Sequence, residues 1–179
     1  MKTLLISTQN PGKVEEYRSI FAHLHLNLLS LNDAGVSTQI EEDGASFTQN
    51  SLLKSYHGYE MTGIPCLADD SGLEVDALGG EPGIYSARYG GEHLTDGDRV
   101  NLVLQNLLHV PEELRIARFL CCISIVGLTS NPIVSLGSIS GMITSSPVGD
   151  KGFGYDPIFF LPSLKKTIGE LSTQEKNLL

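Results

Sequence analysis

The chain is organised around one stretch, residues 65–91, which reads PCLADDSGLEVDALGGEPGIYSARYGG. A short apolar run leads to two adjacent carboxylates, Asp69 and Asp70, which enter a predicted Ser-Gly turn, and a glycine-dense loop containing Arg88 follows. Side chains alternate between the two faces of a strand, so only one aspartate can face a given ligand if the strand persists through both. We therefore expect one aspartate to act on a ligand and the other to support it.

Adjacent carboxylates at a strand end are one way to present oxygen ligands to a metal ion. Mg²⁺ prefers carboxylates, waters and substrate phosphates to a site built from protein alone. The alternative is an Asx-type turn, in which Asp70 and Ser71 bond their own backbone. The stretch by itself leaves both interpretations open.

The length and the cysteines restrict the class of protein. A chain of 179 residues is expected to form one domain, 1–179, that buries about 70% of its unfolded surface. Cys66, Cys121 and Cys122 lie in apolar runs without metal-site spacing, which favours core thiols in a reducing compartment. No signal peptide or membrane span is visible, so we expect a cytoplasmic protein that does not bind membranes.

The charge balance restricts the partners. The formal net charge of −9 argues against a nucleic-acid partner, which requires a basic face. An acidic protein that binds a polyanion must gather its few cations at one place and bring a metal ion. We therefore expect a polyanion site to lie where lysines occur next to polar loops.

The first such lysine follows a short strand pattern. Apolar residues 3–7 lead into the turn 8–13, TQNPGK, and a helical pattern follows over 14–24. The first turn of such a helix presents backbone N–H groups to an anion, and Lys13 lies there. The sequence does not fit the P-loop, whose leading glycine and following Ser/Thr are missing. The alternative is a strand-turn-helix unit that binds nothing.

A second lysine lies on a longer predicted helix. This helix runs from residue 45 or 46 to about 61 and places Phe47, Asn50, Ser51 and Lys54 on one face. Such a face suits one wall of a polar cleft, with Lys54 reaching an anionic group. The acidic run at 41–43, which includes Glu42, is also explained by the preference of carboxylates for helix starts.

The second half of the chain contains one further unusual loop. A helix over 94–108 and strands over 116–128 and 132–139 are predicted, and none carries obvious chemistry. In the loop 149–157, glycines flank Phe153, whose ring could stack on a planar base. The alternative is a buried turn aromatic. Residues 172–175 form a capping box that announces a helix.

Taken together, these stretches resemble the inosine triphosphate pyrophosphatase family, which acts on non-canonical purine nucleoside triphosphates. The resemblance covers nearly the whole chain. It rests on the order and spacing of residues 8–13 with Glu16, 42–44 with Phe47, Asn50 and Lys54, 68–73, 79–89 and 152–157.

The resemblance implies both a fold and an activity. The fold is α/β, with an elongated mixed β-sheet flanked by helices and two lobes around a central cleft. The activity is Mg²⁺-dependent hydrolysis of ITP, dITP or XTP to the monophosphate and pyrophosphate, which cleanses the nucleotide pool. The purine nucleoside triphosphate is then the expected partner, in a homodimer that binds neither nucleic acid nor membrane.

The resemblance also assigns roles to residues. Asp70 is the expected proton acceptor and metal ligand, with Glu42 and Asp69 near the metal. The expected substrate-binding residues are Thr8, Gln9, Asn10, Pro11, Gly12, Lys13, Asn50 and Lys54 on the phosphate side, Ser71, the base-pocket residues Phe153, Gly154, Tyr155 and Asp156, and Lys176.

The chain departs from the family pattern at its end. The pattern continues past Lys176 into a C-terminal Ser-His-Arg segment that contacts the base, and this sequence stops at Leu179. We expect a shortened or differently docked end, with more effect on base discrimination than on phosphate chemistry. Two other functions stay open: a Maf-like pyrophosphatase with another base preference, whose Ser-rich opening is missing at 8–13, and a non-catalytic nucleotide-binding module.

Overall fold

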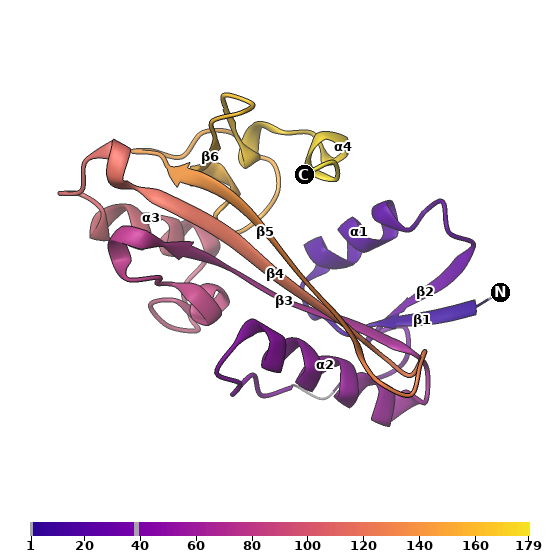
Figure 1. The fold of residues 1–179 in the computed structure, drawn as a ribbon. Coiled ribbons are helices and arrows are strands. Elements are labelled where there is room, and N and C mark those ends of the chain that lie inside the picture. Colours follow the sequence, from indigo (N-terminus) through magenta and orange to yellow (C-terminus); the bar gives the residue numbers. More distant parts are fainter. Residues whose placement is uncertain (1, 38–39) are drawn as a thin grey trace. The chain divides into compact units, whose positions relative to one another are not determined.

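The computed structural model describes residues 2–37 and 40–179. The sequence also predicts a connector over 32–39, and the last two residues of this connector lie outside the described residues. Seven strands form one mixed sheet in the order β2-β1-β3-β4-β5-β6-β7 (Figure 1). The helices are α1 (Pro11–Ile20), α2 (Phe47–Thr62), α3 (Asp96–Asn106) and α4 (Thr173–Lys176); the strands are β1 (Lys2–Ile6), β2 (Leu26–Ser30), β3 (Cys66–Val75), β4 (Ile116–Val126), β5 (Ile133–Ile143), β6 (Phe159–Leu161) and β7 (Lys166–Thr167).

The predicted α/β class with a mixed sheet is confirmed. Strand β1 pairs in parallel with β2 and β3, whereas β6 pairs antiparallel with β5 and β7. The chain divides into two compact units. The first unit comprises Met1–Asp70 and Cys121–Gly137, and the second comprises Ser71–Leu120 and Ser138–Leu179. The cleft between two lobes stays a prediction.

The first unit buries apolar side chains on both faces of its strands. Leu4 and Ile6 belong to a cluster with Tyr17 of α1 and Leu67 of β3. Leu5, between them in sequence, belongs to a different cluster with Leu31, Val36 and Cys66. The alternation of side chains along a strand explains this separation. One face of these strands therefore packs against α1, and the other face is available to α2.

Local sequence signals account for where the two helices of this unit begin. The Asn10 side chain caps α1 by accepting the backbone N–H of Gly12 at 2.8 Å. The Ser46 side chain caps α2 through the N–H of Gln49 at 3.2 Å. The α2 start agrees with the prediction, whereas α1 ends at Ile20, earlier than expected. Residues 21–24 instead form a turn that leads into β2.

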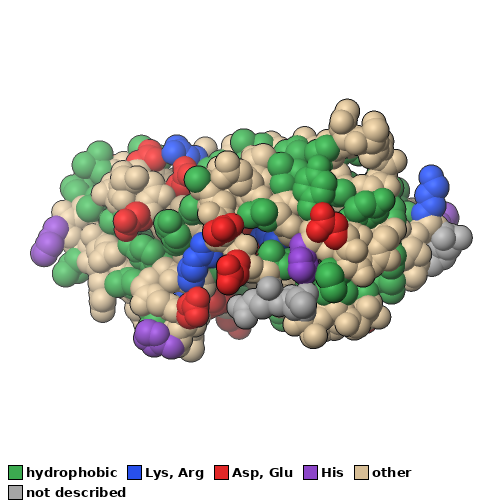
Figure 2. Space-filling model, turned by 90° about the horizontal axis from the view of Figure 1, so that it is seen from below, with side chains coloured by type: hydrophobic (Ala, Val, Ile, Leu, Met, Phe, Trp, Pro, Cys, Tyr) green, Lys and Arg blue, Asp and Glu red, His purple; other side chains and the backbone are tan. Residues whose placement is uncertain are grey.

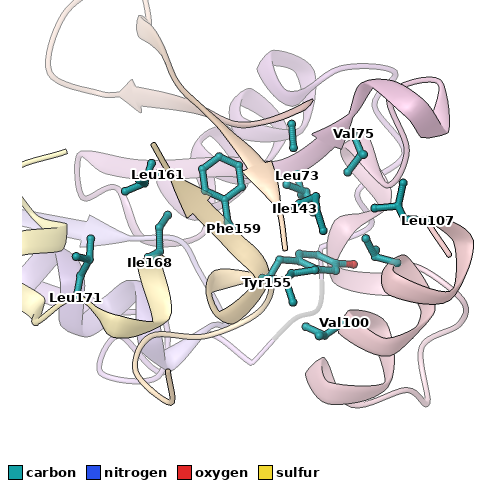
Figure 3. Close-up of a cluster of buried hydrophobic side chains, with 13 residues drawn as sticks. Leu73, Val75, Val100, Leu107, Ile143, Tyr155, Phe159, Leu161, Ile168 and Leu171 are labelled. Carbon is teal, nitrogen blue, oxygen red and sulfur yellow. The ribbon is translucent and has the colours of Figure 1, made fainter. Parts of the chain in front are cut away.

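The second unit has a single larger core (Figure 3). Leu73 and Val75 of β3 are fully buried there with Leu107, which follows α3, and with Phe159 of β6. The predicted helix over 94–108 is observed as α3, and a capping box between Thr95 and Asp98 fixes its start. The residues before and in β6 return into this core, where Ile158 and Phe159 are both 0% exposed.

The strand β3 corrects one expectation. The sequence predicted a turn at Ser71 and Gly72, but the strand continues through both residues to Val75. The physical reason lies in the residues that follow, because burial of Leu73 and Val75 holds the backbone in the sheet. The chain turns only at residues 76–79, where Gly79 adopts a left-handed conformation at φ 66°.

The surface agrees with the acidic composition. Acidic side chains are visible on the face shown in Figure 2, among apolar side chains and a few basic ones. Across the described part of the chain, no helix combines the length and the apolar character needed to cross a membrane.

Candidate active site

The two adjacent aspartates contact different lysines from different helices. Asp69 Oδ2 lies 2.6 Å from Lys13 Nζ of α1, and Asp70 Oδ1 lies 2.9 Å from Lys54 Nζ of α2. Both aspartates are buried, at 3% and 5% exposure. Because β3 persists through both positions, its alternation sends each carboxylate to a different helix. The structure thus separates the pair as the sequence predicted.

Asp70 belongs to a compact charged group on the α2 side. The Lys54 ammonium donates to Asp70 Oδ1 and also to Glu42 Oε1, at 3.0 Å. Asn50 Nδ2 donates to Asp70 Oδ2 at 3.2 Å. We call Glu42, Asn50, Lys54 and Asp70 the acid–lysine group. Two carboxylates in it converge on one cation.

Asn50 also fixes the loop that supplies Glu42. Its Oδ1 accepts the backbone N–H of Gly44 at 2.9 Å. A Cβ at position 44 would lie 2.5 Å from that same oxygen, so the loop can approach α2 only with glycine there. The run Glu42-Asp43-Gly44 therefore has a geometric reason: glycine permits the approach that brings Glu42 to Lys54.

Burial and charge set the protonation of this group. Burial raises the pKa of Asp70 above its usual value, although the Lys54 ammonium opposes the shift. Burial alone would lower the pKa of Lys54, but the charges of Asp70 and Glu42 outweigh it, so that the pKa of Lys54 is raised. Lys54 is thus a cation, and Asp70 is a better proton acceptor than an ordinary aspartate.

The backbone N–H groups of the turn before α1 form hydrogen bonds within the turn itself, which the sequence did not indicate. The expected anion donors are the N–H groups of Gly12 and Lys13, and both are directed to Asn10 Oδ1, at 2.8 and 3.4 Å. The N–H of Asn10 in turn donates to Thr8 Oγ1 at 3.2 Å. Gln9 and Pro11 are exposed in the same turn. The side chain of Lys13, rather than the helix start, is the main cationic feature here.

The second unit holds a separate polar group around Asp156. Lys176 Nζ of α4 lies 2.7 Å from Asp156 Oδ2 and 4.4 Å from the centre of the Phe153 ring. The same oxygen accepts the backbone N–H of Phe153 at 3.0 Å. We call Phe153, Asp156 and Lys176 the aromatic–lysine group. An ammonium held over a ring by a buried carboxylate gives this loop a fixed conformation.

The remaining residues expected to bind the substrate in this unit, Tyr155, Gly154 and Ser71, differ in their surroundings. Tyr155 is 5% exposed within the core of the second unit, and its hydroxyl donates to the carbonyl of Ser86 at 2.9 Å. Its side chain anchors the loop. Gly154 donates its N–H to Asp96 Oδ2 at 3.0 Å. Ser71 is half-buried within β3.

A pocket of about 510 Å³ lies beside this loop in the second unit. Of the residues expected to bind substrate, it includes Phe153 and Gly154 but not Tyr155, Asp156 or Lys176. It is lined by Asp96, Gly97, Val100, Asn101, Pro147, Asp150, Lys151, Gly152, Phe153, Gly154 and Pro157.

Two residues near these groups were not predicted. Tyr17 lies one helical turn after Lys13 and is coupled to Asp69, since burial and the Asp69 charge both raise the pKa of its phenol. The spacing of four residues from Lys13 could have indicated it. Asp96 was expected only near the start of a helix, and its contact with Gly154 spans 58 residues. No local pattern indicates a contact at that separation.

The mixed sheet and the buried acid–lysine contacts define an α/β protein suited to phosphorylated ligands. A family model described as the Ham1 family matches residues 4–179, and the chain belongs to this family. The inosine triphosphate pyrophosphatase resemblance is thereby confirmed.

Individual relatives agree over the full length. The chain is 45% identical to a dITP/XTP pyrophosphatase of Shigella flexneri over 181 residues, covering 100% of this chain and 91% of the relative. It is 44% identical to the dITP/XTP pyrophosphatase of Escherichia coli K12 with the same coverage. The solved structure of a HAM1 protein from Coxiella burnetii is similar at a TM-score of 0.88 and 37% identity, covering 99% of this chain and 90% of that chain. The Staphylococcus aureus Ham1 protein gives 0.87 and 38%, covering 99% and 91%.

Proposed function

We propose that this protein hydrolyses non-canonical purine nucleoside triphosphates, ITP, dITP and XTP, to the monophosphate and pyrophosphate. The observation that carries the proposal is the acid–lysine group, in which buried Asp70 and half-buried Glu42 share one ammonium. The full-length similarity to proteins named dITP/XTP pyrophosphatase supports this substrate class. Hydrolysis of such nucleotides would cleanse the nucleotide pool. We place this activity in the cytoplasm, because the three cysteines are free thiols, as is usual in a reducing compartment.

The chemistry requires a proton acceptor and positive charge. A water oxygen bonds to phosphorus as the anhydride bond between the α- and β-phosphates breaks, and the proton of that water goes to Asp70. The raised pKa of Asp70 favours this transfer. The ammonium groups of Lys13 and Lys54 offset the charge of the phosphates in a chain whose net charge is −9.

The acid–lysine group also fits a divalent cation. Its two carboxylates already converge on one cation, at 2.9 and 3.0 Å. No cluster of three His, Cys, Asp or Glu side chains suited to a metal occurs among the described residues. Asp70 and Glu42 with substrate phosphates match the way proteins hold Mg²⁺. When bound, Mg²⁺ supplies neutralisation of phosphate charge. The third expected ligand, Asp69, contacts Lys13 of α1 and does not belong to this group.

The aromatic–lysine group is proposed to contact the base. The Phe153 ring offers a stacking surface, and the Lys176 ammonium is a donor held next to it. A donor of this kind matches the 6-oxo group of hypoxanthine and xanthine, and it is left unmatched by the amino group of adenine.

We further propose that the protein works as a homodimer. The support is a set of exposed apolar residues at the start of β5 within the first unit, where Ile133, Val134 and Leu136 are 45%, 43% and 64% exposed. Consecutive exposed apolar residues on a strand are typical of an interface.

The function is tested by measuring pyrophosphate release from ITP, XTP, GTP, ATP and TTP in parallel, with and without Mg²⁺. We expect Mg²⁺-dependent release from ITP and XTP well above that from the other three. Preference for a pyrimidine would favour the Maf-like alternative. Nucleotide binding without any pyrophosphate release would show a binding module and would overturn the proposal.

A further inference from the structure

The contact between Lys13 and Asp69 is unusually enclosed for a charged pair. The two atoms lie 2.6 Å apart, and the side chains are 16% and 3% exposed. Removal of two charges from water costs free energy that the attraction between them offsets only with good geometry. This mostly buried pair therefore differs from a surface salt bridge in its desolvation cost, and a functional role would explain why the protein retains it.

Besides the Lys13 ammonium, Asp69 has Tyr17 and Cys121 as uncharged neighbours. Tyr17 is 7% exposed in the apolar cluster with Leu4, Ile6 and Leu67. Burial and the charge of Asp69 raise the pKa of the Cys121 thiol to about 12. The second oxygen of Asp69, Oδ1, is buried without a well-aligned hydrogen bond from the described residues, and the Tyr17 hydroxyl interacts with the Asp69 carboxylate. Lys13 is the cation that Asp69 contacts, so the position of each group depends on the other.

This arrangement is poorly suited to a metal ligand. The strand directs Asp69 to α1, whereas Asp70, Lys54 and Glu42 meet on the α2 side. The strand thus separates the Asp69 carboxylate from the two carboxylates that would share a metal ion. The Lys13 ammonium has three donors, and the contact with Asp69 uses one of them. Two donors of Lys13 can still reach phosphate oxygens.

We propose that Asp69 is a positioning residue that holds the Lys13 ammonium for the substrate phosphates, and that it does not ligate the metal. The inference rests on the proposed function, because it identifies the partner of Lys13 as a triphosphate. A lysine without this anchor samples many rotamers, and ordering it on binding costs conformational entropy. The contact with Asp69 orders the Lys13 side chain when the protein folds, so that this entropy is not lost on substrate binding.

The kinetics of a variant that removes the charge of Asp69 but keeps its shape provide the first test. We expect Asp69→Asn to raise KM for ITP about tenfold while kcat stays within about threefold, because an anchor for binding is lost. The Mg²⁺ concentration for half-maximal activity at saturating ITP should not change. Lys13→Ala combined with Asp69→Asn should be no worse than Lys13→Ala alone, since the two residues act as a unit. A tenfold shift in the Mg²⁺ requirement, or additive effects, would overturn the proposal.

A matched control removes a carboxylate of the same unit that also contacts an α1 cation. Asp33 lies 3.3 Å from Arg18 of α1, and both side chains are 45% exposed. Asp33→Asn changes the net charge as Asp69→Asn does, but it is expected to keep the KM of the original chain. An equal rise in KM for both variants would attribute the effect to net charge and would contradict the anchor.

A binding experiment separates this inference from the proposed function. The probe is inorganic tripolyphosphate in EDTA, measured by calorimetry, which requires neither turnover nor Mg²⁺. Asp69→Asn should weaken binding about as much as Lys13→Ala does, about tenfold. Equal binding by the original chain and Asp69→Asn would refute the anchor even if ITP were hydrolysed. Weakened binding without any hydrolysis of ITP would support the anchor and reject the function.

A measurement on the unchanged chain covers the case in which Asp69→Asn fails to fold. The ¹⁵N resonance of the Lys13 ammonium, assigned with Lys13→Arg, reports the contact with Asp69. Titration with Mg²⁺ alone should shift the Lys54 ammonium, which shares the metal site, and leave that of Lys13 unchanged. Release of the Lys13 signal by Mg²⁺ would show that the metal competes for Asp69 and would overturn the proposal.

Discussion

At the scale of single residues, chemistry in this protein depends on which side of one strand a carboxylate occupies. Asp69 and Asp70 are consecutive and both buried, yet one contacts Lys13 and the other contacts Lys54 and Asn50. Their chemical identity is the same, and their surroundings differ. Substitution of either one should therefore have a distinct signature.

Asp70→Asn is expected to lower the rate of pyrophosphate release by about 10²-fold or more, because the proton acceptor is lost. The amide keeps the shape of the carboxylate, so nucleotide binding should largely persist. The measurements are pyrophosphate release and ITP binding on the same preparation. Activity close to that of the original chain would remove Asp70 from the role of proton acceptor.

Lys54→Met tests the cation at the centre of the acid–lysine group. The substitution leaves Asp70 and Glu42 without the ammonium between them. The free energy of unfolding in the absence of metal should therefore fall by about 3 kcal/mol. Mg²⁺ should then raise the melting temperature of the variant more than that of the original chain, because it takes over the neutralisation. Equal stabilisation of the two proteins by Mg²⁺, measured by thermal unfolding, would contradict a metal between these carboxylates.

At the scale of elements, short segments owe their order to caps. Helix α4 has four residues, which is too short for an isolated helix. Its capping box joins Ser172 to Glu175, and its last residue, Lys176, contacts Asp156. The position of Lys176 near Phe153 thus depends on the cap at Ser172, four residues earlier in the chain.

The cap predicts a pH dependence. Hydrogen bonds from Ser172 and the neighbouring Lys166 lower the pKa of Glu175 to about 2 from 4.5. A lowered pKa means that the stabilising contact is complete above pH 4.5 and is lost as the pH falls through about 2. An NMR titration of the Ser172 amide should therefore show its midpoint near pH 2. A midpoint near 4.5 would show that the cap is not formed, and Glu175→Ala should abolish the transition.

Elements also show how far the sequence could be read. The caps at Ser46, Thr95 and Ser172 were predictable because side-chain and backbone partners lie within three residues. The Ser-Gly turn was predicted wrongly, since two residues that favour turns were overridden by burial of Leu73 and Val75 beyond them. The opposite directions of Asp69 and Asp70 followed from strand geometry alone. The contact of Asp96 with Gly154 did not, because tertiary folding creates it.

At the scale of the whole molecule, the chain combines a net charge of −9 with a proposed polyanionic substrate. Like charges repel at long range, and so the lysines that contact substrate must act locally. Lys13, Lys54 and Lys176 each lie next to a buried aspartate, which fixes the ammonium and partly cancels its charge. This pairing lets an acidic surface coexist with cationic points of contact.

The proposed homodimer is a property of the same scale. Leu136→Lys places a charge on the most exposed apolar side chain of β5 and should convert a dimer into a monomer. Light scattering coupled to size exclusion measures the mass directly. Thr129→Lys, in the exposed turn before β5, adds the same charge and should leave the mass unchanged. A monomeric original chain would reject the homodimer.

The continuous strand β3 has a consequence for how this gene can vary over evolutionary time. Between Cys66 and Asp70, most apolar positions could exchange one hydrophobic residue for another. Gain or loss of a single codon there would instead invert the side-chain order and offer Asp69 to α2 and Asp70 to α1. Insertions and deletions in descendants of this sequence should therefore accumulate in its loops, while the spacing within these five residues stays fixed.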